Sequence, residues 1–269
     1  MTGDRPHTGD AMVAVMLGFL AFMAAGAVGM LLVGRALGVD PVDVPLDHPR
    51  FYAVTLPLTT LAVAGVVVRL CRRNGALVVD ALALNRGRRW WAVLLVLPAG
   101  LLSSRVVNGL MHALPGLDLT TLTDLASVAR TPGALGVLVA LCLILVVPLG
   151  EELLFRGYVF RGLHRGHGPL TAILASSVLF ALFHFDLVQG AGVLIVGLAI
   201  GWVRQVTGSL LPAIAAHAPN NATWWATARY TEGTMEVPLW VDGVALAAIA
   251  FGVWWLRDAL DNCGPPQTG

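Results

Sequence analysis

Long apolar stretches, separated by short polar ones, follow one another along almost the whole chain. Several reach about 20 residues, the length that an α-helix needs to cross the hydrocarbon core of a bilayer. The pattern therefore predicts an all-α fold, a polytopic membrane bundle of about eight transmembrane helices. The expected helices cover residues 11–34, 51–70, 90–112, 134–149, 169–184, 191–203, 210–230 and 239–256.

The connections between these stretches divide the chain into three parts. Residues 1–112 hold the first three helices, with Trp90 and Trp91 at an expected membrane interface. Residues 113–257 begin with a long loop and form a second transmembrane bundle, and residues 258–269 form a polar tail that we expect to be disordered. Shorter turns are expected at residues 161–168, 185–190 and 204–209.

Composition supports a membrane protein. Of the 269 residues, 57% are hydrophobic and 12% are charged, with a mean hydropathy of +0.77, whereas soluble domains carry about 25% charged residues. The first apolar stretch is longer than the core of a signal peptide, so we interpret it as a membrane helix. Cleavage after the sequence Ala25-Gly26-Ala27 is the alternative. The cysteines are odd in number and form no CxxC metal site.

Arginines, which make up all 17 basic residues, are distributed unevenly between the two sides of the predicted bundle. With the N-terminus inside, the outer loops hold only Arg35, Arg50 and Arg130. The positive-inside rule then predicts a multi-pass protein of the cell (plasma) membrane with both termini cytoplasmic. The inner side holds Arg5, Arg69, Arg72, Arg73, Arg86, Arg88, Arg89, Arg161, Arg165, Arg204 and Arg257.

Two adjacent carboxylates, Glu151 and Glu152, end an apolar run whose only ionisable side chain is the thiol of Cys142. A charged side chain at the centre of a bilayer costs about 2.5–3.5 kcal/mol on insertion scales, so these carboxylates must be stabilised. Arg156 follows Glu152 by four residues and shares its helical face. Glu151 lies about 100° from Glu152 around the helix. We predict that Arg156 neutralises Glu152 and that Glu151 points elsewhere.

Two further polar pairs lie in later apolar helices. Phe180 and His184 are four residues apart, as are His217 and Asn221, so each pair shares one helical face. A carboxylate, two imidazoles and a carboxamide make a competent hydrolytic set. Glutamate accepts a proton from water, and histidine orients that water, binds a metal or donates a proton. Asparagine donates hydrogen bonds to a developing oxyanion.

Taken singly, each pair also fits a purely structural role. An arginine four residues after a glutamate is a common way to keep a charge in a membrane. A lone transmembrane histidine or asparagine more often forms a hydrogen bond between helices than a catalytic site, and Phe180 fits a packing role. Glu151 has no evident local partner, which favours a functional role for this residue.

Together and in this order, the motifs EExxxR, FxxxH and HxxxN resemble those of the CPBP family of intramembrane proteases. That family includes the type II CAAX prenyl endopeptidases and the bacteriocin-processing and abortive-infection proteins. The resemblance covers about residues 134–225, and the earlier helices match only as generic membrane helices. It implies that residues 113–257 form a catalytic bundle that hydrolyses a peptide bond near the membrane surface.

The resemblance also implies a role for each motif residue. Glu151 would activate the attacking water, with His184 helping to hold it. His217 and Asn221 would stabilise the oxyanion, and the predicted ion pair would support this geometry. The candidate catalytic residues are Glu151, Glu152, Arg156, His184, His217 and Asn221.

The residues leave two alternatives for the cofactor: the site uses none, or it uses a divalent metal. Glu151, His184 and His217 would give zinc three protein ligands with a fourth position open for water. In the metal-free alternative, Glu151 alone activates the water. We favour this alternative because the HExxH zinc motif is absent from the sequence.

Two other classes of protein fit part of the pattern. A non-catalytic membrane protein, such as a bacteriocin-immunity factor, would use the polar groups only to bind a peptide. A transporter would use them to carry protons, but transporters typically show repeats or paired broken helices, and the sequence shows neither. The expected partners are membrane lipid and a peptide or lipidated-protein substrate, with no nucleic acid.

Overall fold

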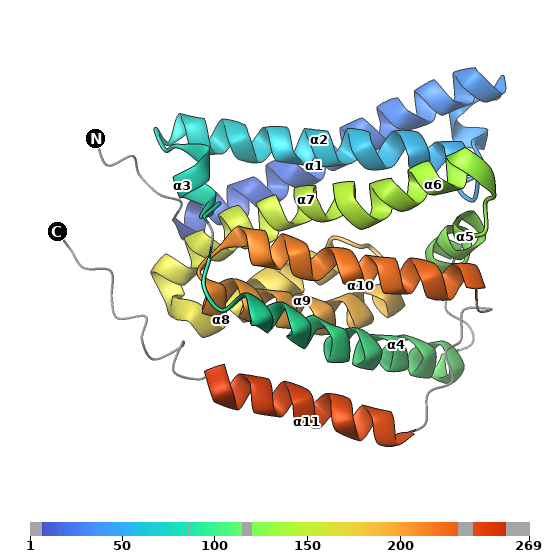
Figure 1. Cartoon of the computed structure of the whole chain (residues 1–269). Helices are drawn as coiled ribbons and strands as arrows, with labels where there is room; N and C mark the ends of the chain where they lie inside the picture. Colours follow the sequence, from blue (N-terminus) through green and yellow to red (C-terminus); the bar gives the residue numbers. More distant parts are fainter. Residues whose placement is uncertain (1–6, 86, 115–119, 231–238, 257–269) are drawn as a thin grey trace.

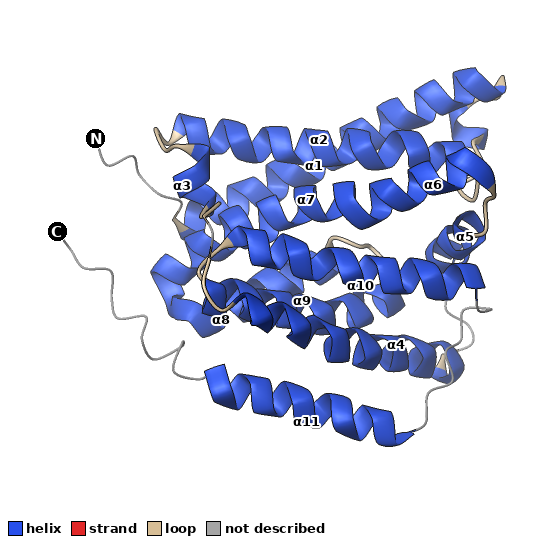
Figure 2. Ribbon diagram, in the orientation of Figure 1, coloured by secondary structure: helices blue, strands red, loops and turns tan. Residues whose placement is uncertain are grey.

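The computed structural model describes residues 7–85, 87–114, 120–230 and 239–256. Within these ranges the chain is helical and has no strand (Figure 2), which confirms the predicted all-α fold. Five helices are long and apolar enough to cross a membrane, so the chain is a multi-pass membrane protein. They are Thr8–Leu37, Pro49–Arg73, Trp90–Met111, Gly133–Leu182 and Leu187–Thr207.

Helices α1 (Thr8–Leu37) and α2 (Pro49–Arg73) form a pair at one side of the bundle, joined through the 3₁₀ turn η1 (Pro41–Asp43) (Figure 1). The two helices pack tightly near Gly29, where an added Cβ would lie 2.5 Å from Cγ2 of Thr55. A glycine at this point lets the two backbones come close, as small residues do between membrane helices.

The third predicted span begins with a 3₁₀ helix and only then continues as an α-helix. Its first residues form the 3₁₀ helix η2 (Trp90–Leu95), and α4 (Val96–Ala113) continues from it. A short helix, α3 (Val78–Leu82), precedes it in the basic connection. The long connection expected at residues 113–133 contains α5 (Thr120–Ala129).

A continuous helical run carries the two glutamates and departs twice from α-helical geometry. The predicted continuation of the helix through Glu152 is confirmed. On each side of α7, however, the backbone forms π-helical turns, a feature that is rare and often found at functional sites. The run consists of α6 (Gly133–Leu141), η3 (Cys142–Val146), α7 (Val147–Glu152), η4 (Leu153–Val159) and α8 (Phe160–Leu182).

The chain reverses direction at a single residue inside this run. Residues 161–168, predicted to be a turn, are helical up to Gly168, where φ is 81° and ψ is 177°. This conformation is essentially restricted to glycine. Phe180, beyond Gly168, packs against Phe155 and Arg156, which lie before it. The two predicted spans are therefore a helical hairpin closed at Gly168.

The last three helices also differ from the predictions at their ends. Helix α9 (Leu187–Thr207) starts directly after Asp186, whose carboxylate accepts a hydrogen bond of 2.8 Å from the backbone N–H of Gln189. The turns predicted at residues 185–190 and 204–209 are thus too long, since Gly190 and Arg204 lie inside α9. Helices α10 (Leu210–Tyr230) and α11 (Leu239–Leu256) follow. The predicted disordered tail lies outside the described residues.

The first two helices hold the helix that carries the glutamates. An added Cβ at Gly150 would lie 2.9 Å from Cγ2 of Thr60 in α2. One at Gly18 in α1 would lie 2.9 Å from Cδ2 of Leu154 in η4. Both N-terminal helices thus pack directly against α7 and η4, and they position the residues described next.

Candidate active site

The predicted ion pair is present and fully buried. Nη1 of Arg156 lies 3.1 Å from Oε1 of Glu152, and both side chains have no exposed surface. The side chain of Glu151, by contrast, is 22% exposed. As predicted, Arg156 neutralises Glu152 within one helical run, and the carboxylate of Glu151 remains accessible.

His217 of α10 contacts both carboxylates through different ring nitrogens. Its Nδ1 lies 2.9 Å from Oε1 of Glu152, and its Nε2 lies 3.7 Å from Oε2 of Glu151. An ionised carboxylate only accepts hydrogen bonds, so Nδ1 of His217 is the donor to Glu152. Glu152 therefore does more than pair with Arg156, because it also fixes the orientation of the imidazole beside Glu151.

Arg156 is held from two further sides. Its Nη2 donates a 2.9 Å hydrogen bond to the backbone carbonyl of Gly197 in α9, and its guanidinium carbon lies 4.4 Å from the centre of the Phe180 ring. A planar cation suits both contacts, because it donates in its plane and stacks on an aromatic face. Gly197 is not among the site residues predicted from the sequence. The sequence feature that points to this residue is the spacing of Gly197 and Gly201, a GxxxG pattern typical of close helix packing.

We expect Gly197→Ala to lower stability. A Cβ at this position would lie 3.1 Å from Nη2 of Arg156 and 3.2 Å from Cδ1 of Phe180, so buried groups must shift. Overpacking of this kind costs about 1–3 kcal/mol. Thermal unfolding in detergent measures the change, with Gly26→Ala as the control, because nothing lies within 4 Å of a Cβ there. Equal stabilities of the two variants would contradict this packing argument.

Phe180 contacts both motif histidines. Its ring makes edge-to-face contacts with His184 at 5.0 Å and with His217 at 5.7 Å between ring centres. His184 also bonds through Nδ1 to the backbone carbonyl of Phe180, at 3.0 Å. Within the described chain, His184 makes no polar contact with Glu151 or His217. Phe180, predicted as packing, therefore sets the relative positions of both imidazoles.

The π-helical segments each offer a backbone carbonyl to a side chain from another helix. Nδ2 of Asn221 in α10 donates to the carbonyl of Leu143 in η3, at 3.0 Å. Nε of the buried Arg204 in α9 donates to the carbonyl of Arg156 in η4, at 3.1 Å. Asn221 thus has one amide hydrogen committed to the scaffold. Arg204 is a supporting residue in a helix, not in the predicted turn.

The suggested zinc ligands do not form a metal site. Among the described residues, no group of three or more His, Cys, Asp or Glu side chains is arranged to hold a metal ion. His184 makes no polar contact with Glu151 or His217 in the described part of the chain, and its Nδ1 bonds to the carbonyl of Phe180 instead. The geometry does not support Glu151, His184 and His217 as a zinc-binding set.

Comparison with known proteins gives one family match. Residues 133–223 match the family described as type II CAAX prenyl endopeptidase Rce1-like. The matched segment runs from the start of α6 to the middle of α10 and contains all three motifs. No curated protein and no solved structure matches the chain. The match supports the resemblance seen in the motifs.

Proposed function

We propose that this chain is an intramembrane endopeptidase in which Glu151 activates the attacking water. Its residues 133–223 match the Rce1-like family. The family match supports a CAAX-protease-like membrane endopeptidase at the family level. One observation carries the finer proposal. His217 lies between a buried carboxylate, which Arg156 neutralises, and the partly exposed carboxylate of Glu151.

The charges of this cluster fit hydrolysis without further groups. Arg156 neutralises Glu152, and each of the two carboxylates faces a ring nitrogen of His217. Such pairing matters because an unpaired buried charge is strongly destabilising. Nδ1 of His217 then donates to Glu152, and Nε2 keeps a second N–H that points to the side of Glu151. The site thus presents a base and a hydrogen-bond donor next to each other.

In the proposed reaction, Oε2 of Glu151 takes a proton from a water molecule as its oxygen attacks the carbonyl carbon of the substrate peptide bond. The carbonyl electron pair moves to the oxygen, which accepts hydrogen bonds from Nε2 of His217 and from the second amide hydrogen of Asn221. The proton held by Glu151 then passes to the amide nitrogen, and the carbon–nitrogen bond breaks. His184 contributes through its edge-to-face contact with Phe180, a ring that also contacts His217.

We also propose that both termini are cytoplasmic, in the plasma membrane. In the structure, several basic positions meet at one end of the bundle, where Arg161 donates to the carbonyl of Asp80 and the N–H of Arg88 donates to the carbonyl of Thr207. The start of α1 lies at the same end, since Thr8 contacts the carbonyl of Gly162. Clustered arginines favour the cytoplasmic side.

The proposal predicts a difference between membrane peptidomes. Cells making wild-type protein should contain peptides or new C-termini that are missing from cells making Glu151→Ala at the same level. Mass spectrometry of isolated membranes measures both sets and identifies the substrate. If the two peptidomes are identical and the variant keeps the cellular phenotype of the wild type, the chain is a peptide-binding or immunity protein.

A further inference from the structure

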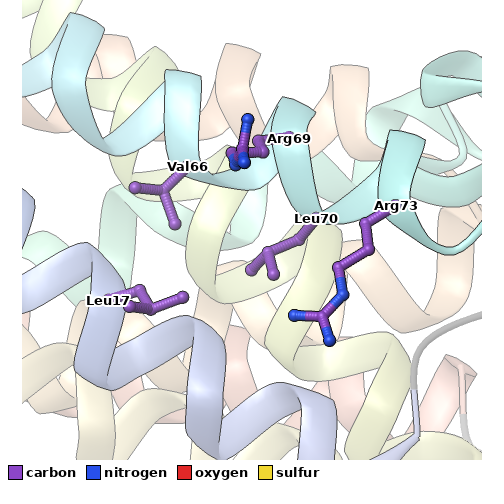
Figure 3. Close-up of a pocket in the computed structure, with 5 residues that line it drawn as sticks. All are labelled: Leu17, Val66, Arg69, Leu70 and Arg73. Atoms are coloured by element: carbon purple, nitrogen blue, oxygen red, sulfur yellow. The ribbon is translucent and has the colours of Figure 1, made fainter.

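A groove between α1 and α2 lies apart from the candidate active site. It has a volume of about 380 Å³. Figure 3 shows Leu17 of α1 facing a row of α2 side chains, with Arg73 extending from the end of that row. None of its lining residues belongs to the three motifs. The groove is lined by Leu17, Val66, Arg69, Leu70 and Arg73.

The groove combines an apolar wall with a charged rim. Leu17 is 40% exposed, and Leu70 forms part of the buried wall. Arg69 and Arg73 are exposed and four residues apart, so they lie on one face of the last turns of α2. The apolar side chains of the groove thus lie farther from the end of α2 than the guanidinium of Arg73.

Within the described residues, Arg69 and Arg73 have no carboxylate partner. Like charges four residues apart repel each other. Arg105 and Arg156, also in membrane helices, both have a carboxylate partner. Two arginines that line an apolar groove make it complementary to a ligand with an anionic head and an apolar tail.

We propose that this groove binds an anionic phospholipid. The phosphate would lie between Arg69 and Arg73, because guanidinium groups bind phosphate oxygens through paired, charge-assisted hydrogen bonds. An acyl chain would cover Leu17, Val66 and Leu70. Basic pockets between membrane helices on the cytoplasmic side are typical sites for anionic lipid headgroups.

The lipid would stabilise the part of the fold that holds the glutamates. Gly18, next to Leu17, packs against Leu154 of η4, and α2 packs against α7 at Gly150. The two helices also contact each other near Gly29 and Thr55, away from the groove. A lipid filling the space near η4 would therefore hold α1 and α2 together where they support the π-helical segment. The binding itself does not depend on proteolytic activity.

Thermal unfolding of the full chain in a neutral detergent tests this proposal. Added phosphatidylglycerol should raise the unfolding temperature, because a ligand that binds only the folded state stabilises it, and phosphatidylcholine should not. In Arg69→Ala/Arg73→Ala, we expect the concentration of phosphatidylglycerol that gives half of the effect to rise about ten-fold or more. The matched control is Arg50→Ala/Arg72→Ala, which also removes two exposed arginines but leaves the groove unchanged.

A second variant, Leu17→Trp, fills the groove and keeps both charges, so it should also weaken the response even if the double variant does not fold. Three results would each overturn the proposal. They are an equal response of the groove and control variants, an equal effect of phosphatidylcholine, and a full effect of inorganic phosphate alone. The last result would mean that the site binds phosphate and not a lipid.

Discussion

Glu151→Gln is expected to lower the rate of peptide cleavage by about 10²–10⁴-fold, the usual contribution of a general base. Glutamine has the shape of glutamate but cannot accept the proton from water. The Glu151 side chain is 22% exposed, and its nearest ionisable partner is Nε2 of His217 at 3.7 Å. The folded state should therefore keep its stability. Release of the peptides that distinguish wild type from Glu151→Ala membranes measures the rate, and thermal unfolding in detergent measures stability.

The neighbouring carboxylate provides the matched comparison. Glu152→Gln makes the same chemical change one residue later, at a fully buried side chain that binds both Arg156 and His217. This variant should lose stability as well as activity, because it leaves Arg156 without its carboxylate. If Glu151→Gln keeps wild-type activity, or if the two variants behave alike in both measurements, Glu151 is not the base.

Arg156→Ala is expected to lower the free energy of unfolding by about 3–5 kcal/mol, the cost of leaving one partner of a buried ion pair. The carboxylate of Glu152 would remain fully buried with only His217 beside it. The carbonyl of Gly197 would also lose its donor. Thermal unfolding in detergent measures the change. Arg72→Ala, at the exposed end of α2, is the control and should change stability by no more than about 0.5 kcal/mol.

A double variant distinguishes the effect of the buried charges on stability from the effect of side-chain packing. Glu152→Gln/Arg156→Met removes both buried charges and keeps an apolar side chain near the Phe180 ring. Replacing a whole buried ion pair by neutral groups is often nearly neutral for stability. We therefore expect the double variant to be more stable than Arg156→Ala. If it is equally unstable, the contacts of Arg156 with Phe180 and Gly197 are the main cause, and the ion-pair argument fails.

Relations within one helix were predictable from the sequence. The apolar stretches indicated the membrane helices, since only helices satisfy backbone polar groups within one segment of a membrane chain. The Glu152–Arg156 pair followed from a spacing of four residues, and the structure confirms it. The helix ends were less predictable. For example, α1 begins at Thr8 and α2 continues to Arg73, because helices extend beyond the apolar core through polar residues.

Relations between helices were not predictable in the same way. Nothing in the spacing of the motifs showed that His217 would contact Glu152 as well as Glu151, because this depends on how α10 packs against α7. The sequence predicts a turn at residues 204–209, but Arg204 lies inside α9. In the structure it is buried between the carbonyl of Arg156 and the Phe160 ring, two partners that only the folded chain brings together.

The two π-helical segments around α7 also change the phase of the helix. A π-turn holds one residue more than an α-turn, so each one rotates all later side chains by about 100° relative to an unbroken α-helix. The stretch Val147–Glu152 therefore has an angular setting of its own, independent of α6 before it and of α8 after it. A helical wheel drawn through the whole run would assign its faces wrongly. The segments η3 and η4 are thus the places where a one-residue insertion or deletion would redirect the glutamates without changing their sequence.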